Sequence, residues 1–377
     1  MRGDPVFMRR SMQQEGMVWS GSGWVIVALL AVCLGACTDS RIEQGNNGTS
    51  GSAVVPMSPA DSLAAALTAI DQRIVSDPGN DALYLERALL HERHDSLDRA
   101  VADVERAIGL DSLNVDYRIH LGDLHYRRIK MGEARDAFQR AVDLAPTSTE
   151  AKLRLGEVYM VLRDYSKAME LVNEALRIDP NAARGYFLKG YIHMETKDTS
   201  RAISSFRTAV EQDPQDYPSY MLLGQLSASR RDRLAEQYYT TAIELRPRSV
   251  EAWYGKGLWA QNNGHDSLAI ACYDRIKELD PMNPLPWYNI GFIKLEHLND
   301  PQGAKADFSK AIDLNTNYAD AWYSRGIAME RTQQPDSAAA NYQICLTIDR
   351  THTLAALAVG RLAKQGVRIK MMERKKK

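Results

Sequence analysis

The fold is decided by LGEVY at residues 155–159, by Ala168 twelve residues beyond its glycine, and by Pro180. A small residue recurs every 33 to 35 positions on either side of that glycine, and we call these positions the anchors. They are Ala88, Gly122, Gly156, Gly190, Gly224, Gly257, Gly291, Gly326 and Gly360. Such a period indicates one supersecondary unit stacked many times, in place of the two or three separate domains that 377 residues would suggest.

Two further positions keep the same phase and predict two helices in each period. An alanine lies about twelve residues beyond the anchor, at Ala100, Ala134, Ala168, Ala202, Ala235, Ala269, Ala304 and Ala338. Four residues later comes a larger side chain, at Val104, Phe138, Val172, Phe206, Tyr239, Tyr273, Phe308 and Tyr342. A glycine in the first helix lets the second helix cross closely, the alanine matches it, and the larger side chain fills the space beside them.

The ends of the second helix are also marked in the sequence. Prolines follow it at Pro146, Pro180, Pro214, Pro247 and Pro281, and a proline forces the preceding residue out of the helical region. Short polar pairs precede it at Asp95-Ser96, Asp198-Thr199, Asp266-Ser267 and Asp336-Ser337. We expect these side chains to cap the free backbone N–H groups of the second helix.

This pattern resembles the tetratricopeptide repeat over residues 81–366. The segment 155–159 with its alanine and proline is a near-complete match, and tryptophans occupy the family's large-residue position four before the anchor at Trp253, Trp287 and Trp322. The resemblance implies an all-α fold, an α-solenoid that winds as a right-handed superhelix. It has about eight helix-turn-helix units and a C-terminal capping helix.

The segments that flank the repeats complete this expected architecture. Residues 59–75 look like an unpaired second helix before the first full repeat. Residues 354–377 look like a capping helix with a basic tail. A terminal helix of a stack needs a polar outer face, which we expect the tail to supply.

The N-terminus has the pattern of an export signal. Arg9 and Arg10 precede an uncharged apolar run, WVIVALLAVCLGA at residues 24–36. The run is too short to span a bilayer as a helix and matches the apolar core of a signal peptide. It ends in LGAC, which resembles the lipobox of bacterial lipoproteins, and this implies fatty-acyl chains such as palmitate on Cys37. An uncleaved anchor helix or a plain secretory signal stay open as alternatives.

The lipobox resemblance also implies an address and a domain organisation. Thr38 follows the cysteine in place of Asp, which in that family favours the outer membrane, facing the periplasm. Several acyl chains give stable anchoring. The expected organisation is a signal peptide at 1–36, the acylated Cys37 with a flexible linker rich in Gly, Ser and Asn at 37–58, the solenoid at 59–366, and a basic tail at 367–377.

The tetratricopeptide family binds partner segments in a concave groove lined by the first helices. Groove positions lie six and three residues before the anchor, and one, four and five after it. This register implies a partner-binding groove of Leu153, Met160, Arg184, Phe187, Tyr191, Met194, Met221, Gln225, Tyr254, Leu258, Tyr288, Phe292, Tyr323 and Ile327. Tyrosine and methionine supply adaptable amphipathic contact surface. The alternative for each single position is packing within the solenoid.

Composition and motifs argue against other classes of function. Lys and Arg total 47 against 48 Asp and Glu, without the basic surplus that nucleic acid requires. The sequence has no glycine-rich phosphate loop, Cys-x-x-Cys pair or nucleophile elbow. We therefore expect no catalytic residues, no cofactor and no small-molecule substrate.

The histidines and cysteines of the repeats have a simple explanation as packing residues. His91, His125 and His193 each lie three residues beyond an anchor, where packing explains them better than a metal site. We expect no metal. Cys272 and Cys345 lie in second helices two repeats apart, too far for a disulfide, and are expected to be buried and free.

Together these patterns predict a membrane-anchored, non-catalytic scaffold of the bacterial cell envelope that binds protein or peptide partners. The alternative is an accessory or recruitment subunit of an envelope enzyme or assembly machine, such as one for outer-membrane assembly, pilus or secretion, or cell-wall synthesis. The fold alone does not choose between them.

Overall fold

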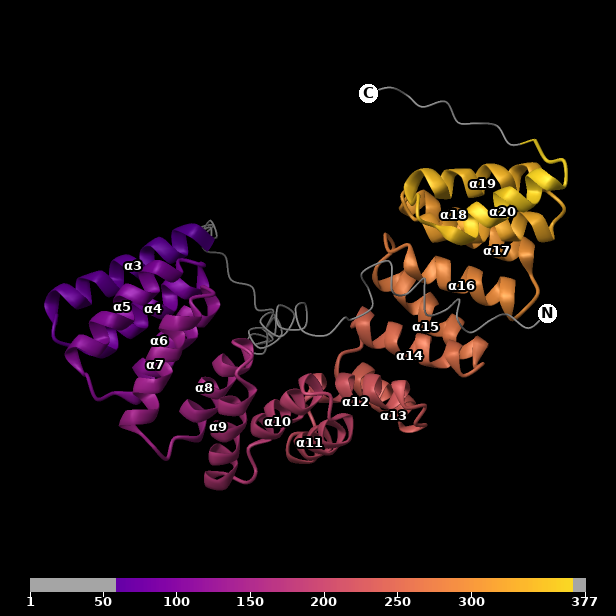
Figure 1. The fold of residues 1–377 in the computed structure, drawn as a ribbon. Coiled ribbons are helices and arrows are strands. Elements are labelled where there is room, and N and C mark those ends of the chain that lie inside the picture. Colours follow the sequence, from indigo (N-terminus) through magenta and orange to yellow (C-terminus); the bar gives the residue numbers. More distant parts are fainter. Residues whose placement is uncertain (1–58, 369–377) are drawn as a thin grey trace, which may run out of the picture. The chain divides into compact units, whose positions relative to one another are not determined.

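The computed structural model describes residues 59–368 (Figure 1), which form two compact units, 59–214 and 215–368. The predictions for residues 1–36, for Cys37 and the linker at 37–58, and for the tail beyond residue 368 lie outside these described residues.

The unit at 59–214 begins with a single helix, which is followed by four helix pairs. The helices are α3 (Pro59–Ser76), α4 (Asp81–Arg93) with α5 (Leu97–Leu110), α6 (Val115–Arg127) with α7 (Met131–Leu144), α8 (Thr149–Val161) with α9 (Tyr165–Ile178), and α10 (Ala183–Glu195) with α11 (Thr199–Gln212). Each helix packs against the next one in the chain. The unpaired second helix expected at 59–75 is confirmed as α3.

The unit at 215–368 has four helix pairs followed by a single helix. They are α12 (Tyr217–Ser229) with α13 (Leu234–Leu245), α14 (Val250–Asn262) with α15 (Asp266–Leu279), α16 (Leu285–Glu296) with α17 (Pro301–Leu314), α18 (Ala319–Arg331) with α19 (Pro335–Ile348), and finally α20 (Thr353–Lys364). No strand occurs among residues 59–368. The predicted all-α architecture of about eight stacked helix pairs is therefore confirmed.

The anchors act as the sequence predicts. A Cβ added at Gly122 would lie 2.4 Å from Cε1 of Phe138, and one added at Gly326 would lie 2.5 Å from Cε1 of Tyr342. The alanines twelve residues beyond the anchors are fully buried. Close approach of the two helices is therefore possible because the first helix has no side chain at this point, and the aromatic ring of the second helix fills the contact.

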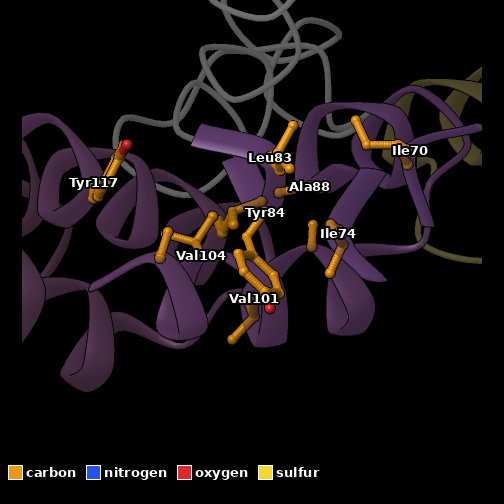
Figure 2. Packing of buried hydrophobic residues seen from close by; sticks show 11 residues of the cluster. Ile70, Ile74, Leu83, Tyr84, Ala88, Val101, Val104 and Tyr117 are labelled. Atoms are coloured by element: carbon orange, nitrogen blue, oxygen red, sulfur yellow. The ribbon is translucent and has the colours of Figure 1, made fainter. Parts of the chain in front are cut away.

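The core of the first repeat extends onto α3. Figure 2 shows Ile70 and Ile74 of α3 in one cluster with Ala88 of α4 and with Val101 and Val104 of α5. Burial of these side chains explains why α3 is ordered although no first helix precedes it within residues 59–368.

The turn inside each helix pair places one residue in the left-handed region. These residues are Asp95, Ile129, Arg163, Lys197, Arg231, Gly264, Asn299 and Gln333, with φ between 51° and 75°. All but Asn299 lie seven residues beyond an anchor, and Asn299 lies eight beyond Gly291. Glycine adopts this conformation without strain, whereas a β-branched residue such as Ile129 does so at a cost.

The expected capping pairs are confirmed at one place out of four. Asp198 caps α11 by accepting a hydrogen bond from the backbone N–H of Arg201. Asp95 has the left-handed conformation and lies one residue before the N-cap position of α5. Asp266 and Asp336 lie inside the first turns of α15 and α19, one and two residues beyond the cap positions of these helices. Ser96, which holds the cap position of α5, donates its hydroxyl to the carbonyl of His94 and makes no capping bond.

Ile129→Gly is expected to stabilise the chain by about 1 kcal/mol, because it removes the left-handed strain of a β-branched residue. Ile129 has φ 59° and is 74% exposed, so little packing is lost. Denaturant unfolding measures the effect as a rise of the midpoint. Gly264→Ile, at φ 75° and with no neighbouring atom within 4 Å of its Cβ position, is the reverse control and should lower the midpoint. An Ile129→Gly midpoint below that of the parent chain would contradict the expectation.

Candidate protein-interaction surface

The predicted groove positions lie on the first helices of both units, and we call them the first-helix face. In the unit at 59–214, four of the six are buried. Leu153 and Met160 of α8 are 2% and 4% exposed, and Phe187 and Tyr191 of α10 are 9% and 1% exposed. These four side chains are therefore buried within the unit, as the packing alternative expects.

The second helix of the same repeat contributes to the burial of Phe187. The ring of Phe187, three residues before its anchor, packs at a centroid distance of 5.9 Å against Phe206 of α11. Burial raises the pKa of Tyr191 far above its ordinary value, which keeps its phenol neutral. In this unit, Arg184 and Met194 are the two predicted residues that stay half-buried.

Arg184 belongs to a network of charges that joins α6, α8 and α10. It pairs with Glu157, and its Nη1 lies 3.6 Å from Glu150. Arg154 lies 2.7 Å from Glu150 and 3.4 Å from Asp123. Burial raises the pKa of Asp123, against the opposing effect of Arg154 and Arg184. The guanidinium of Arg184 is therefore engaged by carboxylates within the protein.

The sequence interpretation missed this network, although a signal for it exists. Acidic residues stand one position after an anchor at Asp123 and Glu157. Basic residues stand before the next anchor, two positions before it at Arg154 and six positions before it at Arg184. Opposite charges at such positions of successive repeats predict pairs between neighbouring first helices.

The unit at 215–368 leaves its predicted positions more accessible. Gln225 of α12 is exposed, and Tyr323 of α18 is the one buried residue of this set, at 8% exposed. The half-buried residues are Met221, Tyr254, Leu258, Tyr288, Phe292 and Ile327. Four successive first helices in this unit therefore present apolar and aromatic side chains that solvent reaches.

Aromatic contacts hold the tyrosines of this surface in place. Tyr254 packs against Tyr273 at 6.1 Å between ring centroids, and Tyr288 packs against Phe308 at 5.7 Å. Tyr323 packs against Tyr342 at 5.4 Å, and burial raises the pKa of Tyr323 to about 12. The rings are therefore oriented by the second helices, and their neutral phenols are hydrogen-bonding groups rather than charges.

Carboxylates along the same helices are paired with arginines. Glu296 lies 2.6 Å from Arg331, and Glu330 lies 2.7 Å from Arg361. Burial acts to raise the pKa of Glu330, but hydrogen bonds from Arg361 and Tyr342 outweigh it and leave the pKa below its usual value. Pairing of this kind leaves an interaction surface dominated by neutral amphipathic groups.

Chemical sites of other kinds do not emerge from the described structure. Across residues 59–368, no three His, Cys, Asp or Glu side chains come together as metal ligands. In the same range, no helix is both long enough and apolar enough to cross a membrane. Of the three histidines interpreted as packing residues, His91 and His125 are buried and His193 is half-buried. Cys272 and Cys345 are buried free thiols, and burial raises their pKa values to about 11 and about 12.

Comparison with known proteins identifies the repeats. Profiles of the tetratricopeptide repeat match residues 130–190, residues 85–149 and 226–284, and residues 183–216. Together these matches cover about half of the chain. A stretch of 98 residues, 26% of this chain, is 28% identical to protein O-mannosyl-transferase TMTC3 of Homo sapiens. It spans 11% of that human protein.

A solved structure agrees in fold. The C-terminal part of a repeat-containing protein from Cytophaga hutchinsonii is 19% identical, with 64% of this chain and 99% of that chain covered and a TM-score of 0.56. A tetratricopeptide repeat protein from Parabacteroides merdae is 14% identical, with 66% and 98% covered and a TM-score of 0.45. The profile matches, the period of the anchors and the stacked helix pairs agree: the chain belongs to the tetratricopeptide repeat family.

Proposed function

We propose that this chain is a non-catalytic scaffold of the bacterial cell envelope that binds a segment of a partner protein on the first-helix face of residues 215–368. One observation carries the proposal: seven of the eight predicted positions in this unit are half-buried or exposed. They combine aromatic, methionine and aliphatic side chains with Gln225. Partly exposed rings and apolar chains of this kind are the usual anchors of peptide recognition.

The chemistry of this surface indicates the kind of segment that it binds. Leu258, Phe292 and Ile327 offer apolar contacts, and burial raises the pKa of Tyr254, so its phenol stays neutral. The neighbouring Glu296 and Glu330 already have arginine partners. An amphipathic segment with apolar anchors therefore fits this surface better than a strongly charged one.

The test is a crosslinking pull-down from envelope extract with a triple variant, Leu258→Ala, Phe292→Ala and Ile327→Ala. Loss of three half-buried contacts should weaken partner binding about 30-fold, or about 2 kcal/mol. The matched control is Leu113→Ala, Leu144→Ala and Met282→Ala, whose side chains are 73%, 38% and 72% exposed. Circular dichroism verifies that both variants keep their helicity.

A discrete partner that the control retains and the triple variant loses supports the proposal. Identical capture by both variants overturns it. If the partner is an enzyme or a component of an assembly machine, the accessory-subunit alternative is the correct form of the function.

The proposed place in the envelope depends on Cys37, which lies outside residues 59–368. Cys37→Ala is expected to move the chain from the membrane fraction to the soluble fraction, because the thiol is the acceptor of the acyl chains that the lipobox resemblance implies. Fractionation with immunodetection measures this, and a variant that stays in the membrane fraction counts against lipid anchoring.

A further inference from the structure

One position of the repeat holds histidine in the unit at 59–214 and not in the unit at 215–368. It lies three residues beyond the anchor. Its occupants are His91, His125, Tyr159 and His193 in the first unit, and Ser227, Ala260, Lys294 and Met329 in the second. Three of the four helix pairs of residues 59–214 therefore have an imidazole at the same place. Because imidazole changes its charge near neutral pH, the two units are expected to respond differently to acid.

His91 of α4 is buried next to a carboxylate that already has a partner. The residue is 9% exposed, and its Nε2 lies 3.8 Å from Asp103 of α5, beyond hydrogen-bond distance. Arg87 donates hydrogen bonds of 2.5 Å and 2.9 Å to that carboxylate. Arg99 of α5 and Arg87 oppose a positive imidazole, whereas Asp71 of α3 favours one. Burial outweighs the attraction of the carboxylates and lowers the pKa of His91.

His125 of α6 is buried as well, at 8% exposed, and its Nδ1 has no hydrogen-bond partner among the described residues. A protonated imidazole has an N–H on both nitrogens, so the charged form would leave this buried donor unsatisfied. Arg128 and Lys130, between α6 and α7, oppose a positive ring, whereas Glu133 of α7 and Glu105 of α5 favour one. Burial is the largest effect, and the pKa of His125 is lowered.

His193 of α10 is half-buried near the start of α11. Asp198 favours a positive imidazole, but its carboxylate also accepts the backbone N–H of Arg201 and caps α11. The side chains of Arg201 and Lys189 oppose a positive ring, and burial, the largest effect, lowers the pKa of His193. All three rings are therefore neutral at pH 7, and charges from the second helix of the same pair act on each of them.

The other histidines of residues 59–368 have different surroundings. His94 and His265 are exposed. A protonated ring has a carboxylate partner at each of the remaining three, in the pairs His120–Glu92 at 2.5 Å, His297–Asp266 at 2.6 Å and His352–Asp320 at 3.2 Å. His352 also caps α20, because its Nδ1 accepts the backbone N–H of Ala355, so α20 has an acid response of its own. Burial without a free carboxylate partner is thus confined to the three positions in the first unit.

We propose that residues 59–214 form an acid-sensitive unit, in which protonation of His91, His125 and His193 loosens the packing of the first helix on the second in three of the four helix pairs. Helices α12 to α19 keep their packing in acid, because no histidine occupies the corresponding position there. The proposed partner surface lies on these helices. Acid therefore opens one unit and leaves the surface of the other formed.

Acid favours the open form because an unfolded histidine binds protons more readily than these three do in the fold. The ordinary pKa of histidine is about 6.5, and the fold lowers it at all three positions. Their contribution to stability is therefore complete above about pH 6.5 and is lost as the pH falls from there toward the folded pKa. At pH 5.5, each histidine that stays neutral in the fold raises the equilibrium constant for opening by up to about tenfold.

Hydrogen exchange of the full-length chain in detergent at pH 7.5 and pH 5.5 tests this, with labelling times scaled to the intrinsic exchange rates. Opening of α4 to α7 and of α10 and α11 should become about tenfold or more frequent at pH 5.5, whereas α12 to α19 should change less than about threefold. Equal responses of the two units overturn the proposal.

The triple variant His91→Gln, His125→Gln and His193→Gln assigns the response to these side chains, because glutamine does not titrate. It should reduce the tenfold acid response to about threefold or less. His94→Gln, at an exposed histidine of the same unit, is the matched control and should respond like the parent. Asp123 and the other titrating groups are the same in all chains. A triple variant that opens in acid as the parent does overturns the proposal.

Nuclear magnetic resonance of the parent chain with labelled histidine rings gives a second measurement that does not depend on folding of the triple variant. Single His→Gln substitutions assign the signals of His91, His125 and His193. At pH 6.0, where an ordinary histidine is mostly protonated, these three signals should still be those of the neutral ring. Three signals that titrate like those of ordinary histidine overturn the proposal.

Discussion

Phe138→Ala is expected to lower the free energy of unfolding by about 4 kcal/mol, the usual cost of deleting a buried aromatic ring. The Phe138 side chain is 1% exposed and lies in a cluster with Ala134, Leu155 and Val158. It also fills the space left by Gly122, so its loss removes the contacts of this ring with α6 and with α8.

Denaturant unfolding followed by circular dichroism measures this cost. Leu113→Ala is the control, because its side chain is 73% exposed and its loss should cost less than about 0.5 kcal/mol. Since repeats contact only their neighbours, hydrogen exchange should show the largest loss of protection in α6, α7 and α8. A cost below about 1 kcal/mol would contradict the role assigned to this ring.

The fold could be predicted from the sequence because its determinants are local and periodic. Gly122 and Phe138 belong to one repeat, and the same pair of roles recurs at Gly326 and Tyr342. A short-range rule that recurs along the whole stack determines the register. The unpaired helix α3 and the terminal helix α20 follow from the same rule.

Accessibility of the candidate site could not be predicted, because it depends on neighbours that the repeat pattern does not specify. Phe187 and Tyr288 both lie three residues before an anchor and both pack on an aromatic ring of the second helix. Phe187 is nevertheless buried, while Tyr288 is half-buried. Likewise, Tyr191 and Phe292 share one position, and only Tyr191 is buried. The ring contact with the second helix therefore does not determine the exposure of these positions.

The polar outer face expected of the capping helix illustrates the same point. The expected polar face comes from the basic tail, most of which lies beyond residue 368, while the described outer face of α20 carries Leu354 and Leu357 beside Arg361 and Lys364. Composition near a terminus does not reveal which helix face the charges cover. The exposure of each side chain had to come from the structure.

Gly122→Ala is expected to destabilise the chain by about 3 kcal/mol, although alanine is the better helix former. The added Cβ would lie 2.4 Å, 2.6 Å and 2.7 Å from three ring atoms of Phe138. These distances are far inside van der Waals contact, so the ring or the helix has to move, as in an overpacked core. The gain of about 1 kcal/mol in helix propensity does not compensate.

Gly109→Ala is the matched control, and it should change stability in the opposite direction. Gly109 lies in the last turn of α5, and no atom lies within 4 Å of its Cβ position. Alanine there should stabilise the chain by up to about 1 kcal/mol. Equal effects at the two glycines would mean that close approach is not what the anchor provides.

A second substitution identifies the clash itself as the cause. Phe138→Leu alone should cost about 1 kcal/mol as an apolar exchange of smaller volume. In the Gly122→Ala/Phe138→Leu double variant, the smaller side chain makes room for the added methyl group. The double variant should therefore lose about 1.5 kcal/mol less free energy of unfolding than the two single variants lose together, which is a typical coupling between contacting residues. If the losses of the two single variants simply add in the double variant, the cost of Gly122→Ala arises within helix α6 and not from its contact with α7.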